Sequence, residues 1–130
     1  MKKKPKILII CSEYNGTSKL LKSAKLGLLK KGIKFQCIKV YGAFEIPVSI
    51  SRNIKKYDGF VALGIIIKGQ TANFNLISQA ITNALMELSI LHKKPIGNGV
   101  LTCLNNNQAK KRFHKGEEAV NAVLTVLANG

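Results

Sequence analysis

The stretch GFVALGIII at residues 59–67 decides the fold class of this 130-residue chain. It is an unbroken apolar run of strand length, rich in β-branched residues and bounded by turn residues, which is typical of a strand buried on both faces. A shorter apolar run follows Lys6 at residues 6–11, and residues 35–40 and 96–102 are interpreted as two further strands, although polar residues interrupt them. We therefore expect four strands, with residues 59–67 at the centre of the sheet.

Segments with helical spacing separate these apolar runs. The spacing is clearest at residues 77–91, where apolar residues recur every three or four positions until Pro95 ends the segment. Four further helices are expected: residues 20–29, residues 45–56, a short basic helix opened by a capping box of Asn105 and Gln108, and residues 119–127. Strands that alternate with helices predict a parallel sheet covered on both faces, in one domain that spans residues 1–130.

The composition predicts a soluble protein and leaves two interpretations of its charge. Hydrophobic residues make up 46% of the chain, but no apolar run reaches the roughly 20 residues that cross a bilayer. The basic start lacks a signal-peptide core, so we expect a cytoplasmic protein without a membrane partner. The formal charge is +15, from 21 Lys and Arg against 6 Asp and Glu. A solvated lysine-rich surface is preferred over a nucleic-acid-binding surface, because the lysines lie along helix faces without interleaved aromatic residues.

The cysteines and histidines show no pattern of a metal site. Cys11, Cys37 and Cys103 are far apart in the sequence and adjoin strand-like runs, which favours buried structural thiols. His92 and His114 lack the partner spacing of a metal site or a catalytic triad. The sequence therefore predicts no bound metal.

A candidate site lies where the predicted strands end, because ligands bind beyond the carboxyl ends of parallel strands. Four segments converge there: residues 12–15, 41–45, 68–71 and 102–105. Gly69-Gln70-Thr71 is expected to open the long helix, where free N–H groups and the helix dipole favour an anion, with Lys68 adding charge. An ordinary glycine turn is the equal alternative. Neither a Walker loop nor a GxGxxG string is present.

Other residues near the strand ends are suited to a polar, phosphate-bearing ligand. Arg112, within the basic cluster at residues 110–115, has the geometry for bidentate phosphate binding, which Lys lacks. Tyr14 is suited to stacking on a polar ring, and Phe44 and Glu45 to offering it backbone amides. Each residue also has an ordinary structural interpretation. The basic cluster would be a solvated helix face, Tyr14 would lie on the surface and Phe44 in the core. Glu45 would interact favourably with the positive end of the helix dipole.

Three strings in chain order resemble the lumazine synthase family of riboflavin biosynthesis. VYGAFEIP at residues 40–47 resembles V-P-G-A-F-E-I-P, ALGIIIKGQT at residues 62–71 resembles A-L-G-x-x-I-[RK]-G-x-T, and GVLT stands at residues 99–102. Tyr14 followed by Asn15 and the Q-A-x-x-R string at residues 108–112 fit as well. The resemblance covers essentially the whole chain, and it implies a three-layer α/β/α, flavodoxin-like fold with a four-stranded parallel sheet and helices on both faces.

The resemblance implies a cofactor-free condensation of 5-amino-6-ribitylamino-uracil with 3,4-dihydroxy-2-butanone 4-phosphate, a pyrimidine amine and a butanone phosphate. In this mapping Tyr14 stacks on the pyrimidine, residues 43–45 bind the ribityl chain, and residues 69–71 with Arg112 hold phosphate. The substrate-binding residues that it implies are Tyr14, Asn15, Gly42, Ala43, Phe44, Glu45, Ile66, Ile67, Lys68, Gly69, Gln70, Thr71, Asn98 and His114.

The chain departs from the family pattern at positions that concern catalysis. Asn73 stands where the family commonly has a proton-transferring His, and Asn75 where it has an acidic residue. Asn cannot shuttle a proton near neutral pH as His can. Arg112 and Lys115 are the other expected catalytic residues, with Lys115 in place of the family's second lysine. His114 is a candidate to supply the missing proton transfer.

The family forms homopentamers, some of which assemble into capsids, with active sites shared between neighbouring subunits. We expect a homopentamer, with larger assemblies and a riboflavin synthase partner as further possibilities. The alternative function is a catalytically weakened homologue that binds flavin or lumazine, or that serves as an assembly scaffold. Asn73 is the residue that supports this alternative.

Overall fold

The computed structural model describes residues 4–129 and contains a four-stranded sheet in which all strands are parallel. The strands are β1 (Ile7–Ser12), β2 (Phe35–Val40), β3 (Gly59–Ile67) and β4 (Ile96–Cys103). Their order across the sheet is β2-β1-β3-β4. β3 is an interior strand and is buried along its whole length, as its apolar sequence predicts.

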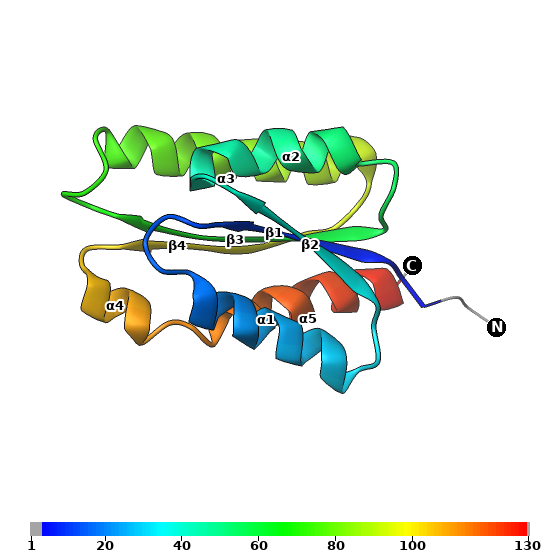
Figure 1. Ribbon diagram of the computed structural model, residues 1–130. Helices are drawn as coiled ribbons and strands as arrows, with labels where there is room; N and C mark the ends of the chain where they lie inside the picture. Colours follow the sequence, from blue (N-terminus) through cyan, green and yellow to red (C-terminus); the bar gives the residue numbers. More distant parts are fainter. Residues whose placement is uncertain (1–3, 130) are drawn as a thin grey trace.

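Helices cover both faces of the sheet. They are α1 (Ser18–Lys30), the 3-10 turn η1 (Ala43–Glu45), α2 (Ile46–Asn53), α3 (Phe74–His92), α4 (Asn106–Lys110) and α5 (Lys115–Ala128). Figure 1 shows α2 and α3 on one face, and α1, α4 and α5 on the other. The predicted three-layer α/β/α architecture is confirmed.

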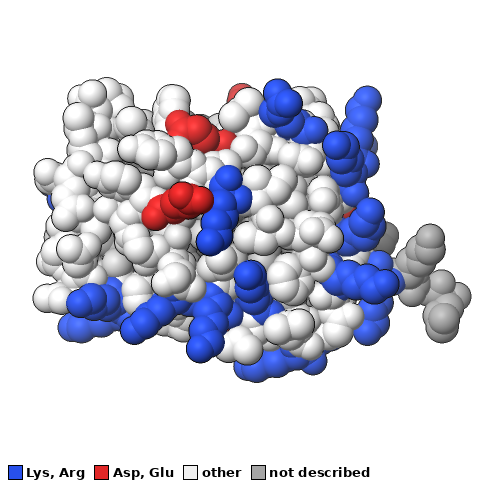
Figure 2. Space-filling model, in the orientation of Figure 1, with Lys and Arg blue, Asp and Glu red and all other residues white. Residues whose placement is uncertain are grey.

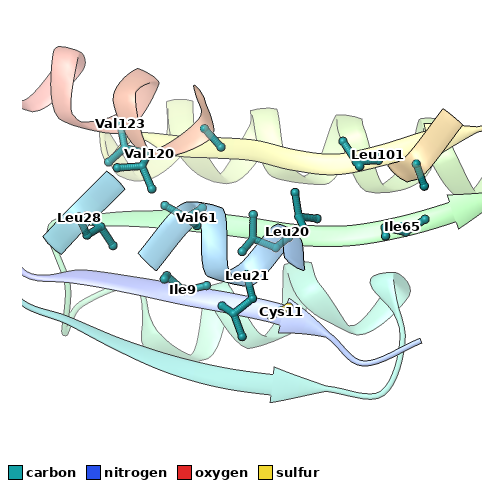
Figure 3. Close-up of a cluster of buried hydrophobic side chains, with 14 of the residues drawn as sticks. Ile9, Cys11, Leu20, Leu21, Leu28, Val61, Ile65, Leu101, Val120 and Val123 are labelled. Atoms are coloured by element: carbon teal, nitrogen blue, oxygen red, sulfur yellow. The ribbon is translucent and has the colours of Figure 1, made fainter. Parts of the chain in front are cut away.

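Alternate residues of each strand divide between two hydrophobic cores. Ile9 packs towards α1 and α5, whereas Leu8 packs towards α2 and α3, because successive side chains of a strand point to opposite faces. In the first core, Leu20 of α1 and Val120 of α5 meet Ile9 and Val61 of the sheet (Figure 3). The central strands are therefore apolar on both faces and are packed between two layers of helices.

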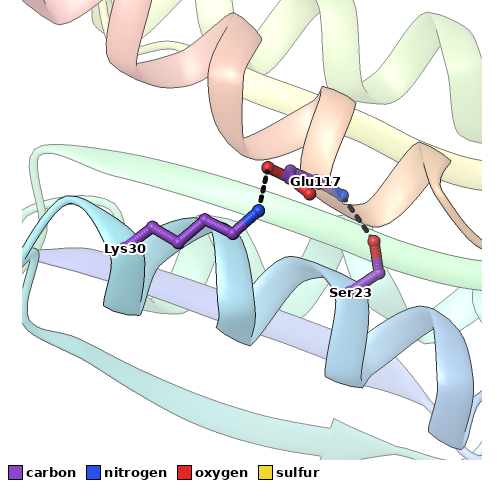
Figure 4. A network of polar contacts seen from close by, with 3 residues as sticks. All are labelled: Ser23, Lys30 and Glu117. Atoms are coloured by element: carbon purple, nitrogen blue, oxygen red, sulfur yellow. Dashed lines mark hydrogen bonds and ion pairs between the residues drawn. The ribbon is translucent and has the colours of Figure 1, made fainter.

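A close helix contact joins α1 and α5 at Gly116. A Cβ atom on Gly116 would lie 2.9 Å from the backbone nitrogen of Ala24 and closer still to a backbone carbonyl of α1. Beside this contact, the backbone N–H of Glu117 donates to Ser23 Oγ at 3.0 Å, and its carboxylate pairs with Lys30 at 3.2 Å (Figure 4). The absence of a side chain at position 116 thus fixes how close the two helices lie.

The start of the long helix differs from the sequence-based expectation. Gly69-Gln70-Thr71 does not open α3, which begins at Phe74. Gly69 has φ +88° and Asn73 has φ +57°, both in the left-handed region. A right-handed helix cannot include such residues, so residues 68–73 form separate turns before it.

Two other helices have different bounds from those expected. The helix predicted at residues 45–56 is shorter, because η1 occupies its start and turns replace its last residues, although Pro47 does lie in its first turn. The last helix begins at Lys115, four residues before the expected start, with Glu117 and Glu118 in its first turn. Acidic residues there complement the positive end of the helix dipole.

The cysteines are free and differ in burial. Cys11 and Cys103 are buried as predicted, but Cys37 is only half-buried because it lies on the edge strand β2. Burial raises the pKa of all three thiols above the ordinary value of 9.0. Among residues 4–129, no three His, Cys, Asp or Glu side chains form a group suited to a metal ion.

Lysines concentrate where the strands begin and along α1. Figure 2 shows Lys and Arg side chains along the lower edge, over α1, and at the right-hand end of the view. Three helices end at that side of the sheet, and each is followed or closed by a lysine pair: Lys30 and Lys31, Lys55 and Lys56, and Lys93 and Lys94. Cations stabilise helix C-termini, which gives part of the positive charge a local role. None of the helices in residues 4–129 has the length and apolarity to span a membrane.

Candidate active site

A cleft of about 390 Å³ opens at the carboxyl end of the sheet, on the side of α2 and α3. Its volume falls within the range of small-molecule sites. Five segments form it: the β1–α1 loop, the β2–η1 turn with η1, the end of β3, the turns at residues 70–72 and the start of α3. The structure brings together nine of the residues expected at the site: Tyr14, Asn15, Gly42, Ala43, Phe44, Glu45, Ile66, Gln70 and Thr71.

The β1–α1 loop is fixed by the side chain of Asn15. This residue has φ +70°, and its Nδ2 donates a hydrogen bond to the carbonyl oxygen of Ile65 at 2.9 Å. The amide of Asn15 thus links the loop to β3. The preceding Tyr14 is half-exposed at the cleft, with its ring centroid 6.4 Å from that of Tyr41. Two tilted aromatic rings therefore form one wall of the cleft.

The β2–η1 turn orients a carboxylate. The backbone N–H of Gly42 donates to Glu45 Oε1 at 2.8 Å, and the N–H of Glu45 donates to the carbonyl of Gly42 at 3.2 Å. No hydrogen bond to the second carboxylate oxygen comes from the described residues. Phe44 is exposed beside it, while Ala43 is buried against the sheet. The turn thus presents one free carboxylate oxygen and an aromatic ring to a ligand.

The turn at residues 68–71 closes the cleft at the end of β3. The N–H of Gln70 donates to the carbonyl of Ile67 at 3.2 Å, and Gln70 and Thr71 line the cleft. Lys68 and Gly69 are exposed outside it, and the N–H of Lys68 donates to the carbonyl of Cys103 at 2.9 Å. This hydrogen bond ties the turn to the end of β4.

Besides Lys68 and Gly69, three further expected residues of the sheet and of the start of α3 lie apart from the cleft. Ile67 is buried in the core beneath α1 and α5. Asn73 is exposed at the start of α3, in the left-handed conformation. Asn98 is exposed on the edge strand β4, where its Oδ1 accepts from the N–H of Val100 at 3.0 Å.

Arg112 lies at the end of β4, on the opposite side of the sheet from the cleft. Its Nη1 donates to the carbonyl of Thr102 at 3.4 Å and lies 4.0 Å from Cys103 Sγ. The neighbouring Phe113 packs with the core under α1 and α5, whereas the cleft opens towards α2 and α3. One chain therefore holds Arg112 and the cleft at the same end of the sheet but does not bring them together.

The residues after Arg112 form a small charged cluster. His114 Nε2 lies 3.1 Å from Glu118 Oε2, and Lys115 Nζ lies 3.6 Å from Glu118 Oε1. The N–H of Lys115 donates to the carbonyl of Arg112 at 3.0 Å, which closes the turn between α4 and α5. His114 and Lys115 thus share a turn with Arg112 and, like it, do not line the cleft.

Sequence reasoning missed three residues of the cleft: Ile65, Ala72 and Ile77. Tyr41 was placed among the segments at the strand ends but was given no substrate-binding role. Ile77 belongs to the apolar stripe of a helix, and nothing in the sequence separates it from the core residues of that stripe.

Comparison with known proteins gives a consistent result over the whole chain. The family profile described as 6,7-dimethyl-8-ribityllumazine synthase matches residues 4–129. Proteins with that name from Agrobacterium fabrum and Bartonella tribocorum are each 38% identical, over 95% and 98% of this chain and 93% and 91% of their own lengths. One from Cutibacterium acnes is 34% identical over 94% of this chain and 80% of its own.

A solved structure supports the fold alone. A flavone reductase superposes with a TM-score of 0.52 at 13% identity, covering 93% of this chain, which spans 62% of that protein. The similarity in sequence, by contrast, extends over the segments that form the cleft and the turn after α4. The chain belongs to the 6,7-dimethyl-8-ribityllumazine synthase family.

Proposed function

We propose that this protein is a 6,7-dimethyl-8-ribityllumazine synthase of the cytoplasm. It condenses 5-amino-6-ribitylamino-uracil with 3,4-dihydroxy-2-butanone 4-phosphate and releases phosphate and water. Family membership supports the reaction. The observation that carries the proposal for the site is that the Ala43-Phe44-Glu45 turn and the Gln70-Thr71 turn lie in one cleft.

In this proposal the cleft binds the pyrimidine substrate. Tyr14 stacks on the planar ring, and Tyr41 lies close enough to extend the same wall. The free oxygen of Glu45 accepts a hydrogen bond from a ribityl hydroxyl, because the other oxygen is already held by Gly42. A fixed acceptor loses little conformational entropy on binding, so the turn favours one orientation of the substrate.

The phosphate-bearing substrate then reacts beside the turn at residues 68–71. The pyrimidine amine attacks the ketone and forms an imine with loss of water, phosphate is eliminated, and ring closure with loss of a second water gives the lumazine. Holding both substrates in reactive orientation supplies much of the rate acceleration. Arg112 binds the phosphate and stabilises the charge of the departing anion.

Arg112 reaches the cleft of a neighbouring subunit in this proposal. The supporting observation is a large apolar surface on α3 and α2 that a single chain leaves exposed: Val48, Leu76, Met86, Ile90 and Leu91. Leu91 is 74% exposed and lines one hollow between α2 and α3 together with Val48 and Ile90, and exposed apolar patches are typical of protein interfaces. We propose a homopentamer that buries this surface, with capsids and a riboflavin synthase partner as further proposals. Light scattering should give about five times the 14.2 kDa of one chain.

The test of the function is an assay with both substrates that records phosphate release and the lumazine chromophore. The synthase should release one phosphate for each lumazine formed. Arg112→Ala should lower the rate by about 10- to 150-fold, because a hydrogen-bonded charged group contributes about 1.5–3 kcal/mol. A homologue that only binds ligands would retain the pyrimidine without releasing phosphate, and this result would contradict the proposal.

A further inference from the structure

The cleft lacks a side chain that ordinarily exchanges protons near neutral pH. Its titratable groups among the described residues are Glu45, Tyr14 and Tyr41. Carboxylates and phenols ordinarily titrate well away from neutral pH, whereas imidazole titrates close to it. Glu45 is also held by the N–H of Gly42. The elimination of phosphate in the proposed reaction requires removal of a C–H proton, so the cleft is incomplete for this step.

The chain has two histidines, and only one lies at the correct end of the sheet. His92 is the last residue of α3, at the end where the strands begin. His114 precedes α5 on the turn after α4, which lies at the end where the strands finish (Figure 1), and the same turn carries Arg112, whose Nη1 donates to the carbonyl of Thr102 near the end of β4. If Arg112 reaches the phosphate in a neighbour's cleft, His114 arrives with it, because the two residues belong to one closed turn.

His114 is both oriented and accessible. Its Nε2 lies 3.1 Å from Glu118 Oε2, and the other oxygen of Glu118 lies 3.6 Å from Lys115 Nζ. A carboxylate that accepts from Nε2 leaves Nδ1 as the nitrogen with a free lone pair. The His114 side chain is 63% exposed and that of Glu118 54%, so a neighbouring subunit can pack against this pair.

We propose that His114 of one subunit, oriented by Glu118, is the base for phosphate elimination in the cleft of the adjacent subunit. Its Nδ1 takes the proton from the carbon beside the imine carbon, and the C–H electron pair forms a C=C bond to the next carbon. The C–O bond from that carbon to phosphate breaks, and phosphate leaves with its electron pair. The imidazolium returns the proton to the departing phosphate. Arg112 holds that phosphate, and Glu118 is a positioning residue.

Substitution and chemical rescue test the role of His114, and the test rests on the proposed synthase activity. In single-turnover assays, His114→Gln and His114→Ala should slow phosphate release about 100-fold, the usual contribution of a general base. Free imidazole should restore part of the rate of the Ala variant. His92→Ala is the matched control and should be unaffected. Retained activity of both His114 variants, or a loss that imidazole does not restore, overturns the proposal. An inactive wild-type protein instead overturns the synthase function itself.

The positioning role of Glu118 has a separate readout. Glu118→Gln should slow the protein that contains His114 but leave the imidazole-rescued rate of His114→Ala unchanged, because free imidazole needs no orienting carboxylate. A merely structural role would slow both reactions equally, and this result would remove Glu118 from the proposal.

Mixed assemblies test whether His114 acts across the subunit boundary. Co-expressed His114→Ala and Glu45→Ala chains should regain about one quarter of the wild-type rate. About half of the clefts are intact, and about half of these have a neighbour with an intact turn. Mixtures of His114→Ala with Arg112→Ala carry both lesions on the same turn and should remain inactive. No recovery in the first mixture would show that each site is built within one chain and would overturn the assignment to the neighbour.

Discussion

Asn15 offers a quantitative test of how the aromatic wall of the cleft is held. Two features of this residue are separable: a left-handed backbone with φ +70°, and the hydrogen bond from Nδ2 to the carbonyl of Ile65 at 2.9 Å. Glycine tolerates the left-handed backbone but cannot make the hydrogen bond. Alanine neither tolerates this backbone nor makes the hydrogen bond. Asn15→Gly and Asn15→Ala are therefore a matched pair that differ in backbone strain.

The two features of Asn15 set the expected loss of free energy in each variant. Loss of the hydrogen bond should cost about 1 kcal/mol in both variants. Alanine in the left-handed region should cost about 1 kcal/mol more, for a total of about 2 kcal/mol. If the cost appears as opening of the loop that carries Tyr14, pyrimidine affinity should fall about 5-fold for Asn15→Gly and about 30-fold for Asn15→Ala.

Titration calorimetry with the pyrimidine substrate measures both affinities, and urea unfolding shows whether the loss is local or global. Equal affinities of the Gly and Ala variants would refute the contribution of backbone strain. Affinities equal to that of the wild type in both variants would refute the argument that Asn15 holds Tyr14 in place.

Three other predictions concern stability. Gly116→Ala should destabilise the fold by about 1–3 kcal/mol in chemical unfolding, because its Cβ would press on the α1 backbone near Ala24. Lys30→Ala should change stability by less than about 1 kcal/mol, since the ion pair with Glu117 is largely exposed, and a larger loss would contradict this view of the pair. The free energy of unfolding should fall as the pH rises above 9.0. Burial raises the pKa of the thiols in the fold, so they ionise more readily in the unfolded chain. Cys11→Ala should reduce this fall in a pH series of unfolding curves.

Features encoded by short-range sequence were predicted well. β3 followed from its unbroken apolar run. Half of the predicted capping box formed: the N–H of Gln108 donates to Asn105 Oδ1 at 2.9 Å, but Gln108 Oε1 accepts from the N–H of Leu104 and not from that of Asn105. The helix after Gly69-Gln70-Thr71 started later than expected, because the left-handed backbone of Asn73 has no signature in the sequence. Asparagine adopts the left-handed conformation more readily than most residues, but most asparagines do not adopt it, and only the surrounding structure selects the conformation.

The residues of the cleft were predicted only in part, because the sequence indicates the end of the sheet at which a loop lies but not the side. Parallel strands end at one edge, so Tyr14, Glu45 and Thr71 were expected close together before any coordinates were known. The face of the sheet on which each loop lies does not follow from strand order along the sequence. Arg112 therefore could be assigned to the correct end of the sheet but not to a side.

The separation of Arg112 from the cleft has a consequence for assembly. Each chain carries an open cleft on the side of α2 and α3 and a basic turn on the side of α1 and α5. A two-fold contact would need the cleft and the basic turn to lie in one self-complementary patch, whereas they lie on different sides of the sheet, so the proposed sharing of the site favours a head-to-tail contact. Head-to-tail contacts of one kind close into a ring when the rotation between neighbours divides a full turn. In such a ring every cleft receives the basic turn of one neighbouring subunit, so all sites are equivalent. A free monomer should therefore have almost no phosphate-releasing activity.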